Sequence, residues 1–154
     1  MKTLNEYIIE GLKINSKTKV NKYSCKPKTK YDLKDIIRER LDKDKDANLN
    51  DIDVSNITDM FNLFHNLDPH NIDISEWDVS KVTNMMGMFD ECENFNSDLS
   101  EWDVSNVTDM QDMFFDCRKF NSDLSNWDVS NVKFMHDMFH GCTSLKNKPS
   151  WYKG

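Results

Sequence analysis

Apolar residues along most of this chain recur with a period of 25 residues. The tetrapeptide Trp-Asp-Val-Ser begins at Trp77, Trp102 and Trp127, and Ile52 opens a matching stretch in the same register. A fixed period between about 20 and 50 residues is typical of a solenoid, in which each unit buries its apolar face only against its neighbours. The pattern therefore predicts four stacked coils that begin at positions 52, 77, 102 and 127.

Each repeat combines a short stretch that favours an extended backbone with a stretch whose apolar residues follow helical spacing. In the third repeat, residues 99–105 are expected to be extended and residues 107–120 to be helical. Stacked strands lie about 4.8 Å apart, whereas packed helices need about 8–10 Å, so the strands would line the inner side of an arc. We expect an α/β repeat solenoid, similar to a leucine-rich repeat, of four strand-plus-helix coils.

The chain before the repeats divides into two predicted segments. Residues 1–30 hold a short amphipathic helix over 3–12 and a Lys-rich linker or docking tail. Residues 31–47 are expected to form an N-terminal capping helix, because the end coil would otherwise expose its core face. The four-repeat solenoid then spans residues 48–154. The apolar stripe of the capping helix consists of Leu33, Ile36, Ile37 and Leu41.

Stacking the repeats would place like side chains in columns. Regular placement on the inward face of the expected helices favours a structural core for these columns over an adaptable methionine-rich binding groove. The core columns are Met60, Met85, Met110 and Met135; Met88, Met113 and Met138; and Phe64, Phe89, Phe114 and Phe139.

Two further columns carry chemically reactive or charged groups. One of these columns holds cysteine in the last three repeats, and Leu67 takes its place in the first repeat. This substitution favours a small apolar packing role for the cysteines, which we expect to be free thiols in a reducing compartment. Aspartates stacked about 5 Å apart repel one another, so either backbone amides of the neighbouring turn or a bound hard cation must offset their charge. The columns are Cys92, Cys117 and Cys142, and Asp53, Asp78, Asp103 and Asp128.

Composition and charge narrow the functional classes. Residues 48–154 carry seven basic and 19 acidic groups, a net charge of −12, which disfavours nucleic-acid binding by the solenoid. Residues 1–30 carry eight lysines and two glutamates, so this segment is suited to an acidic partner or a larger assembly. No apolar run approaches the roughly 18 residues of a membrane span, and the opening residues lack a secretory signal. We expect a location in the cytoplasm of a bacterial host or in a virion.

The string His136-Asp137-Met138-Phe139-His140 is the one motif with a catalytic appearance. Two imidazoles one helical turn apart approach the His-Glu-x-x-His layout of zinc proteases. However, the acid is aspartate, a third ligand is missing from the pattern, and both histidine columns vary between repeats: Met86 and Gln111 in one, His65, Asp90 and Phe115 in the other. We interpret His136 and His140 as weak metal candidates on an exposed edge, and we expect neither catalysis nor a cofactor.

The repeat core, Trp-Asp-Val-Ser-Asn-Val-Thr-Asp-Met followed by Met-Phe, a Cys and Phe-Asn-x-Asp-Leu-Ser, resembles the 25-residue repeats of BspA-like leucine-rich repeat surface proteins. This unit is also identified with a mycoplasma lipoprotein-associated domain of unknown function. The resemblance covers about residues 48–145 and implies a repeat protein that binds other macromolecules without catalysis. The opening Leu4-Asn5-Glu6-Tyr7-Ile8-Ile9-Glu10 looks like phage-encoded relatives in gut bacteria.

These observations favour a non-enzymatic protein–protein interaction module that presents a short, curved acidic repeat surface to a protein partner. The alternative is a structural or decoration component of a phage particle, docked through its N-terminal tail, and a third hypothesis is an adhesin-like surface protein. Large side chains in outward columns that vary between repeats are the contact candidates: Phe61, Phe115, Phe134, His136 and His140.

Overall fold

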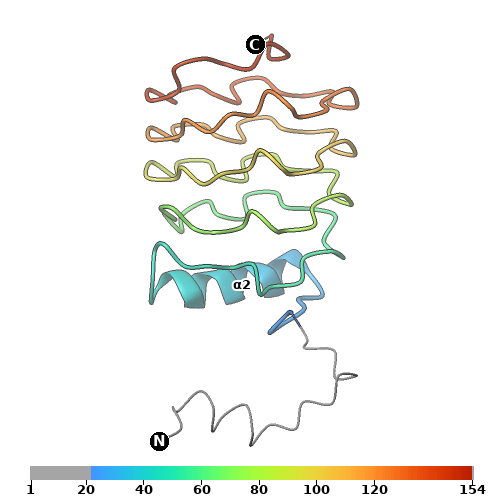
Figure 1. Cartoon of the computed structure of the whole chain (residues 1–154), viewed down its shortest axis with the longest axis vertical. Coiled ribbons are helices and arrows are strands. Elements are labelled where there is room, and N and C mark those ends of the chain that lie inside the picture. The colour runs from blue at the N-terminus through green and yellow to red at the C-terminus, as the bar shows by residue number, and fades with distance from the viewer. Residues whose placement is uncertain (1–21, 154) are drawn as a thin grey trace, which may run out of the picture.

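Successive repeats lie one above another as layers of a straight stack in the computed structural model, which describes residues 22–153 (Figure 1). We refer to residues 52–76, 77–101, 102–126 and 127–151 as the first to fourth coils. The arc that the sequence predicted is therefore absent. The helix predicted over residues 3–12 falls outside the described residues.

The coils are held together by a parallel ladder along one edge of the stack. Met60 N–H donates to Asn84 O (2.9 Å), Met85 N–H to Asp109 O (2.9 Å) and Met110 N–H to Phe134 O (2.8 Å). In the opposite direction, Thr83 N–H donates to Thr58 O (2.9 Å). We call the residues that make this ladder the paired segments: 58–66, 83–91, 108–116 and 133–141. Within residues 22–153 the pairing consists of isolated parallel bridges, at Asp59–Asn84, Asn84–Asp109 and Asp109–Phe134 on this edge, and at Cys25–Ile52 and Asn48–Asp73 elsewhere.

The α/β solenoid of four strand-plus-helix coils predicted from the sequence is wrong. The paired segments, which were expected to be helical, are chains of tight turns, and no extended strand precedes them in the described residues. Met113 N–H, for example, donates to Met110 O (3.3 Å), and Cys117 N–H donates to Phe114 O (3.1 Å). A turn closed between residues i and i+3 returns the chain to the same face every three residues. Its apolar spacing therefore imitates that of a helix.

Left-handed residues at fixed positions separate these turns. Within each paired segment two residues have positive φ, between 51° and 73°, which interrupts any continuous helix. Asn, Asp and Gly fill these positions in all cases but one, because they tolerate the left-handed region better than other residues. The two columns are Asn62, Gly87, Asp112 and Asp137, and Asn66, Glu91, Asp116 and Gly141.

The segments predicted to be extended also form turns, and here the aspartate column finds its partners. Ser105 donates both its amide (3.1 Å) and its hydroxyl (2.6 Å) to Asp103 Oδ1. Ser80 bonds Asp78 in the same way, at 3.2 and 2.6 Å. The charge is therefore stabilised by the serine two residues further on in the same coil. Neither the neighbouring turn nor a cation is required.

Tryptophan connects each coil to the preceding one. The indole N–H of Trp77 donates to Leu49 O (2.9 Å), that of Trp102 to Ile74 O (3.0 Å) and that of Trp127 to Leu99 O (3.0 Å). All three rings are buried. A buried indole N–H needs an acceptor, so this bond fixes the height of one coil above the next as well as filling the core.

Phenylalanine rings form a continuous stack through the centre. Phe64, Phe89, Phe114 and Phe139 have successive centroid distances of 5.0, 5.5 and 5.7 Å and interplanar angles of 14°, 4° and 2°. Coils this close cannot contain helices, whose axes pack about 8–10 Å apart. The same short repeat distance explains why the stack does not curve.

The cysteines of the repeats are free thiols that point at carbonyl groups of the preceding coil. Cys117 Sγ lies 2.9 Å from Phe89 O and Cys142 Sγ lies 3.0 Å from Phe114 O. Their role is thus more than apolar packing, since the weak S–H donor has a defined acceptor. Burial raises the pKa of both thiols, that of Cys142 to about 12 and that of Cys117 further.

Helix α2, Lys30–Leu41, lies across the N-terminal end of the stack (Figure 1). Thr29 and Asp32 begin it with a reciprocal capping box, in which each side chain accepts the other's backbone amide. Leu33, Ile37 and Leu41, four residues apart, are buried against the first coil. Among the described residues, no helix combines the length and apolarity needed to cross a membrane.

Lysines around α2 donate to carbonyl groups of the first coil. Lys34 Nζ donates to Asn62 O (2.6 Å) and His65 O (3.2 Å), and Lys45 Nζ donates to Leu67 O (2.7 Å). Carbonyl groups that would otherwise end unpaired are thereby satisfied. Because α2 is not a coil, Leu67 can replace cysteine at this level without losing the coil-to-coil thiol contact.

Alkylation should distinguish the thiols by burial. In native protein at mildly alkaline pH we expect iodoacetamide to modify half-buried Cys25 readily and Cys142 slowly, and to leave Cys92 and Cys117 unmodified, because the thiolate is the nucleophile and burial suppresses it. Mass spectrometry of tryptic peptides measures each site. Unfolding in urea should make all four react, and equal labelling of native protein would contradict this packing.

The aspartate turns should contribute to acid stability. Hydrogen bonds from Lys26 and Ser55 lower the pKa of Asp53 to about 2. A carboxylate with a depressed pKa stabilises the fold above its unfolded value near 3.8, and that stabilisation is lost as pH falls toward about 2. Asp53→Asn should therefore lower the urea midpoint at neutral pH but match the unsubstituted protein near pH 2.

Asp78→Asn is the matched control for this prediction. Asp78 accepts the same two bonds from Ser80 but makes no ion pair among the described residues. The Asp78→Asn variant should therefore lose less stability than Asp53→Asn at neutral pH. Equal losses would mean that the Lys26 ammonium (2.6 Å from Asp53) contributes nothing.

Candidate functional site

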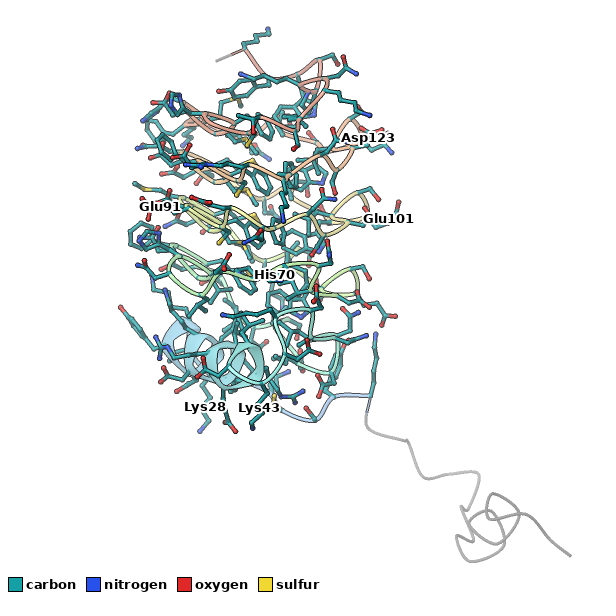
Figure 2. The ribbon with its side chains drawn as sticks, turned by 90° about the vertical axis from the view of Figure 1, so that its left-hand side faces the viewer. Lys28, Lys43, His70, Glu91, Glu101 and Asp123 are labelled. Carbon is teal, nitrogen blue, oxygen red and sulfur yellow. The ribbon has the colours of Figure 1, made fainter. Side chains whose placement is uncertain are left out.

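The outward side chains of the paired segments vary from coil to coil. Figure 2 shows Glu91, from the second paired segment, at one edge of the stack, with Glu101 and Asp123 at the opposite edge. Outward columns on the Glu91 edge hold different chemistry at each level. They are Asp59, Asn84, Asp109 and Phe134; Phe61, Met86, Gln111 and His136; and His65, Asp90, Phe115 and His140.

Phe115 and His140 form a stacked pair between the third and fourth coils. Their ring centroids lie 4.8 Å apart with an interplanar angle of 15°. His140 is exposed and Phe115 half-buried, so the pair presents a flat aromatic surface to solvent. Phe134 and His136 lie in the same paired segment as His140, so four of the five contact candidates gather near the C-terminal end of this edge.

Phe134 occupies a column that has a structural role in the other coils. Asp59, Asn84 and Asp109 each accept the amide two residues further on, at 2.9, 3.0 and 3.0 Å. In the fourth coil a phenylalanine stands there, 55% exposed, and the amide of His136 has no such acceptor. At this one position the fourth coil lacks the stabilising bond from the side chain to the amide two residues further on, and an exposed ring stands there instead. A local departure of this kind is expected of a functional site.

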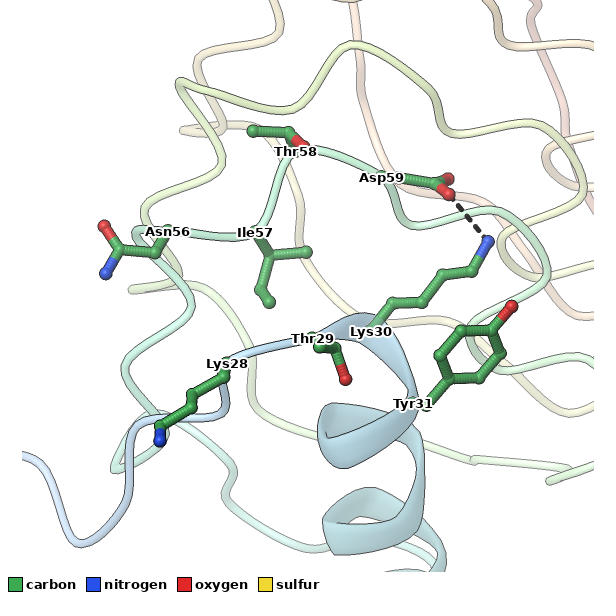
Figure 3. Close-up of a pocket in the computed structure, with 8 residues that line it drawn as sticks. All are labelled: Lys28, Thr29, Lys30, Tyr31, Asn56, Ile57, Thr58 and Asp59. Atoms are coloured by element: carbon green, nitrogen blue, oxygen red, sulfur yellow. Dashed lines mark hydrogen bonds and ion pairs between the residues drawn. The ribbon is translucent and has the colours of Figure 1, made fainter.

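Phe61 is the contact candidate that the structure separates from the rest. It lies at the N-terminal end of the stack, where Lys30 Nζ sits 5.0 Å from its ring centroid and 2.6 Å from Asp59 Oδ2. Figure 3 shows the adjoining cleft of about 310 Å³, between the start of α2 and the first coil, with this ion pair at its side. Phe61 therefore packs against the cap, which leaves it 38% exposed.

His136 and His140 do not share the helical face that suggested a metal site. A left-handed residue, Asp137, lies between them, and His140 faces Phe115. Within residues 22–153, no group of three His, Cys, Asp or Glu side chains is placed to hold a metal ion. The structure thus assigns these histidines to an outward edge, with one of them engaged in ring stacking.

An acidic hollow adjoins the aromatic pair. It has a volume of about 430 Å³ and is lined by Asp68, Glu91, Glu93, Asn94, Asp116 and Arg118. A second, smaller hollow of about 210 Å³ brings Asp90, Glu91 and Asp112 to Phe115. These acids were not selected from the sequence, although their columns are visible there, because their meeting depends on the left-handed turns.

Asp90 also forms a pair with the histidine of the coil below. His65 Nδ1 lies 3.3 Å from Asp90 Oδ2. Burial raises the pKa of Asp90, and the imidazole opposes this shift only in part. The outward column thus changes from a His–Asp contact at the lower coils to ring stacking at the upper ones.

Restoring the missing acceptor should stabilise the fourth coil. Relative to Phe134→Ala, we expect Phe134→Asp to raise the free energy of unfolding by about 0.5–1 kcal/mol, because the carboxylate can accept the His136 amide as Asp109 accepts that of Gln111. Urea unfolding measures the difference. Two variants of equal stability would show that Phe134 does not displace a structural bond.

Comparison with known proteins adds a family and no individual relative. No curated protein and no solved structure matches the chain. A family model described as "Mycoplasma protein of unknown function, DUF285" matches residues 32–152, which include all four coils and α2 except for its first two residues. The chain therefore belongs to this family of Mycoplasma proteins of unknown function.

Proposed function

We propose that this protein is a non-enzymatic interaction module that binds a protein partner through the C-terminal part of its variable edge. The contact surface consists of Phe115, Phe134, His136 and His140. We call it the aromatic edge. Membership of the BspA-like group and a phage origin stay predictions, as does docking through residues 1–30.

The observation that carries this proposal is Phe134. Three coils keep an Asp or Asn at its position to hold a turn, whereas the fourth coil exposes more than half of a phenylalanine there. Single exposed apolar residues are ordinary on protein surfaces. Here, however, the ring replaces a residue with a defined structural bond, and it shares a paired segment with the histidine that stacks on Phe115.

The chemistry of the surface also supports protein recognition. Rigid aromatic rings supply contact area at low cost in side-chain entropy, and for this reason they are enriched at interfaces. The stacked pair restrains Phe115 and His140 before any partner arrives. The acidic hollows lie on the lower coils, where they favour a hydrogen-bond-donating group in whatever part of the partner reaches past the aromatic edge.

Selection from a random displayed peptide library on the immobilised protein tests the aromatic edge. Peptides that bind should lose about tenfold or more in affinity on Phe134→Asp or Phe115→Ser, since burial of a central aromatic ring often contributes more than 1 kcal/mol. Fluorescence polarisation of each peptide measures this.

Tyr31→Ser is the matched control. Tyr31 is 71% exposed but lies on α2 at the opposite end of the stack, so its loss should leave peptide binding unchanged. If the selected peptides bind every variant equally, the aromatic edge is not the contact surface. Urea midpoints of Phe134→Asp and Phe115→Ser, measured beside that of the unsubstituted protein, show whether lost binding reflects unfolding.

A further inference from the structure

The last coil leaves part of its inner face uncovered. In the third coil Val104, Val107 and Met110 are 1%, 0% and 0% exposed. Their counterparts in the fourth coil, Val129, Val132 and Met135, are only partly buried. The core columns of the stack therefore continue to its C-terminal end and reach solvent there.

The residues that follow the fourth coil cover only the other part of this end. The indole N–H of Trp151 donates to Leu124 O (3.0 Å), and Tyr152 meets Phe139 edge-on with centroids 5.0 Å apart. Leu145 packs beside them. This closing segment covers Phe139, which is buried, and leaves the face formed by Val129, Val132 and Met135 open.

Backbone groups of the same region lack the partners that every lower coil supplies. Met85 and Gly87 donate to Asp109 O and Gln111 O, both at 2.9 Å. The corresponding amides of the fourth coil belong to Met135 and Asp137, and no group in the described part of the chain accepts either one. An unpaired ladder edge beside exposed apolar side chains is suited to an added strand.

The charge of this end is opposite to that of the rest of the stack. Residues 127–154 carry four lysines and two aspartates, a net charge of +2, whereas residues 48–126 carry three basic and 17 acidic groups, a net charge of −14. Lys133 lies in the terminal paired segment itself, next to Phe134, and is exposed. An acidic segment fits here, although the sides of the stack would repel it.

We propose that the open edge of the fourth coil binds an extended, acidic and apolar segment of a partner protein, which adds a parallel strand to residues 133–141. This inference rests on the proposed function and specifies how the partner is bound. The carbonyl groups of the segment accept the amides of Met135 and Asp137, its apolar residues cover Val132 and Met135, and Phe134 packs on its side.

A second copy of the chain fits this edge less well. Two C-terminal ends would bring together surfaces of the same positive charge. The N-terminal end of another copy is closed by α2, with Lys34 already bonded to the carbonyl groups of the first coil. An acidic segment from another protein meets neither obstacle.

The chain itself supplies the probe for a test. A synthetic, end-blocked peptide with the sequence of residues 104–116 carries three aspartates and the apolar residues that pair in this geometry within the stack. We expect it to bind, and to slow hydrogen exchange of the Met135 and Asp137 amides by ~10-fold or more, as followed by NMR at saturating peptide. A scrambled peptide should do neither.

Charge variants separate strand addition from adventitious association. Lys133→Glu should weaken binding of the probe by ~3- to 10-fold, whereas Lys119→Glu, an exposed lysine outside the paired segments, should leave it unchanged. Phe134→Asp should also weaken binding of the probe peptide, because the phenylalanine ring packs beside the added strand.

The outcomes distinguish this inference from the proposed function. If the amides of Met135 and Asp137 stay unprotected at millimolar probe while library-selected peptides still depend on Phe134, strand addition is overturned and the aromatic edge stands. Protection of these amides without peptide, together with a dimer in sedimentation, would identify a second copy as the occupant and overturn the inference. Loss of both responses contradicts both proposals.

Discussion

The parallel backbone pairing between coils is the constraint on which the rest of this structure depends. An amide in one coil meets a carbonyl about 25 residues further on, at 2.8–3.2 Å, and the phenylalanine rings inside follow at 5.0–5.7 Å. Both the backbone ladder and the phenylalanine stack thus have about the spacing of neighbouring β-strands. This spacing excludes helices from the repeats and forces like residues into columns. It also gives each column a fixed partner: serine for aspartate, a carbonyl for tryptophan and another for cysteine.

A stack held in this way has two ends, and the chain treats them differently. At the N-terminal end α2 covers the core with Leu33, Ile37 and Leu41, and lysines bond the first carbonyl groups. At the C-terminal end Trp151 and Tyr152 cover only part of the last layer. The asymmetry has a consequence for binding, because unpaired amides and half-buried valines occur together at the second end. The exposed ring of Phe134 lies beside them.

In such a stack we expect functional residues where one coil holds a different type of residue from the other coils in the same column. Most columns are uniform because every coil needs the same bond. The Asp59 column keeps an Asp or Asn acceptor for three coils and then changes to phenylalanine, and the Phe115 column changes from a His–Asp contact to ring stacking. Neither change improves the packing of the core. Both lie toward the end that is left open, which is why a single contact surface accounts for them.

The sequence by itself determined the period, the register and the inward columns, because each repeats at an interval that only a stack explains. It did not determine the local backbone. Apolar spacing of three and four residues is shared by a helix and by successive turns, and only the coil-to-coil distance decides between them. The left-handed Asn62, Gly87 and Asp112 were visible as a column of poor helix formers. The stacking of Phe115 on His140 and the unpaired amides of Met135 and Asp137 were not, because contacts between coils and the closure of an end exist only once the coils are assembled.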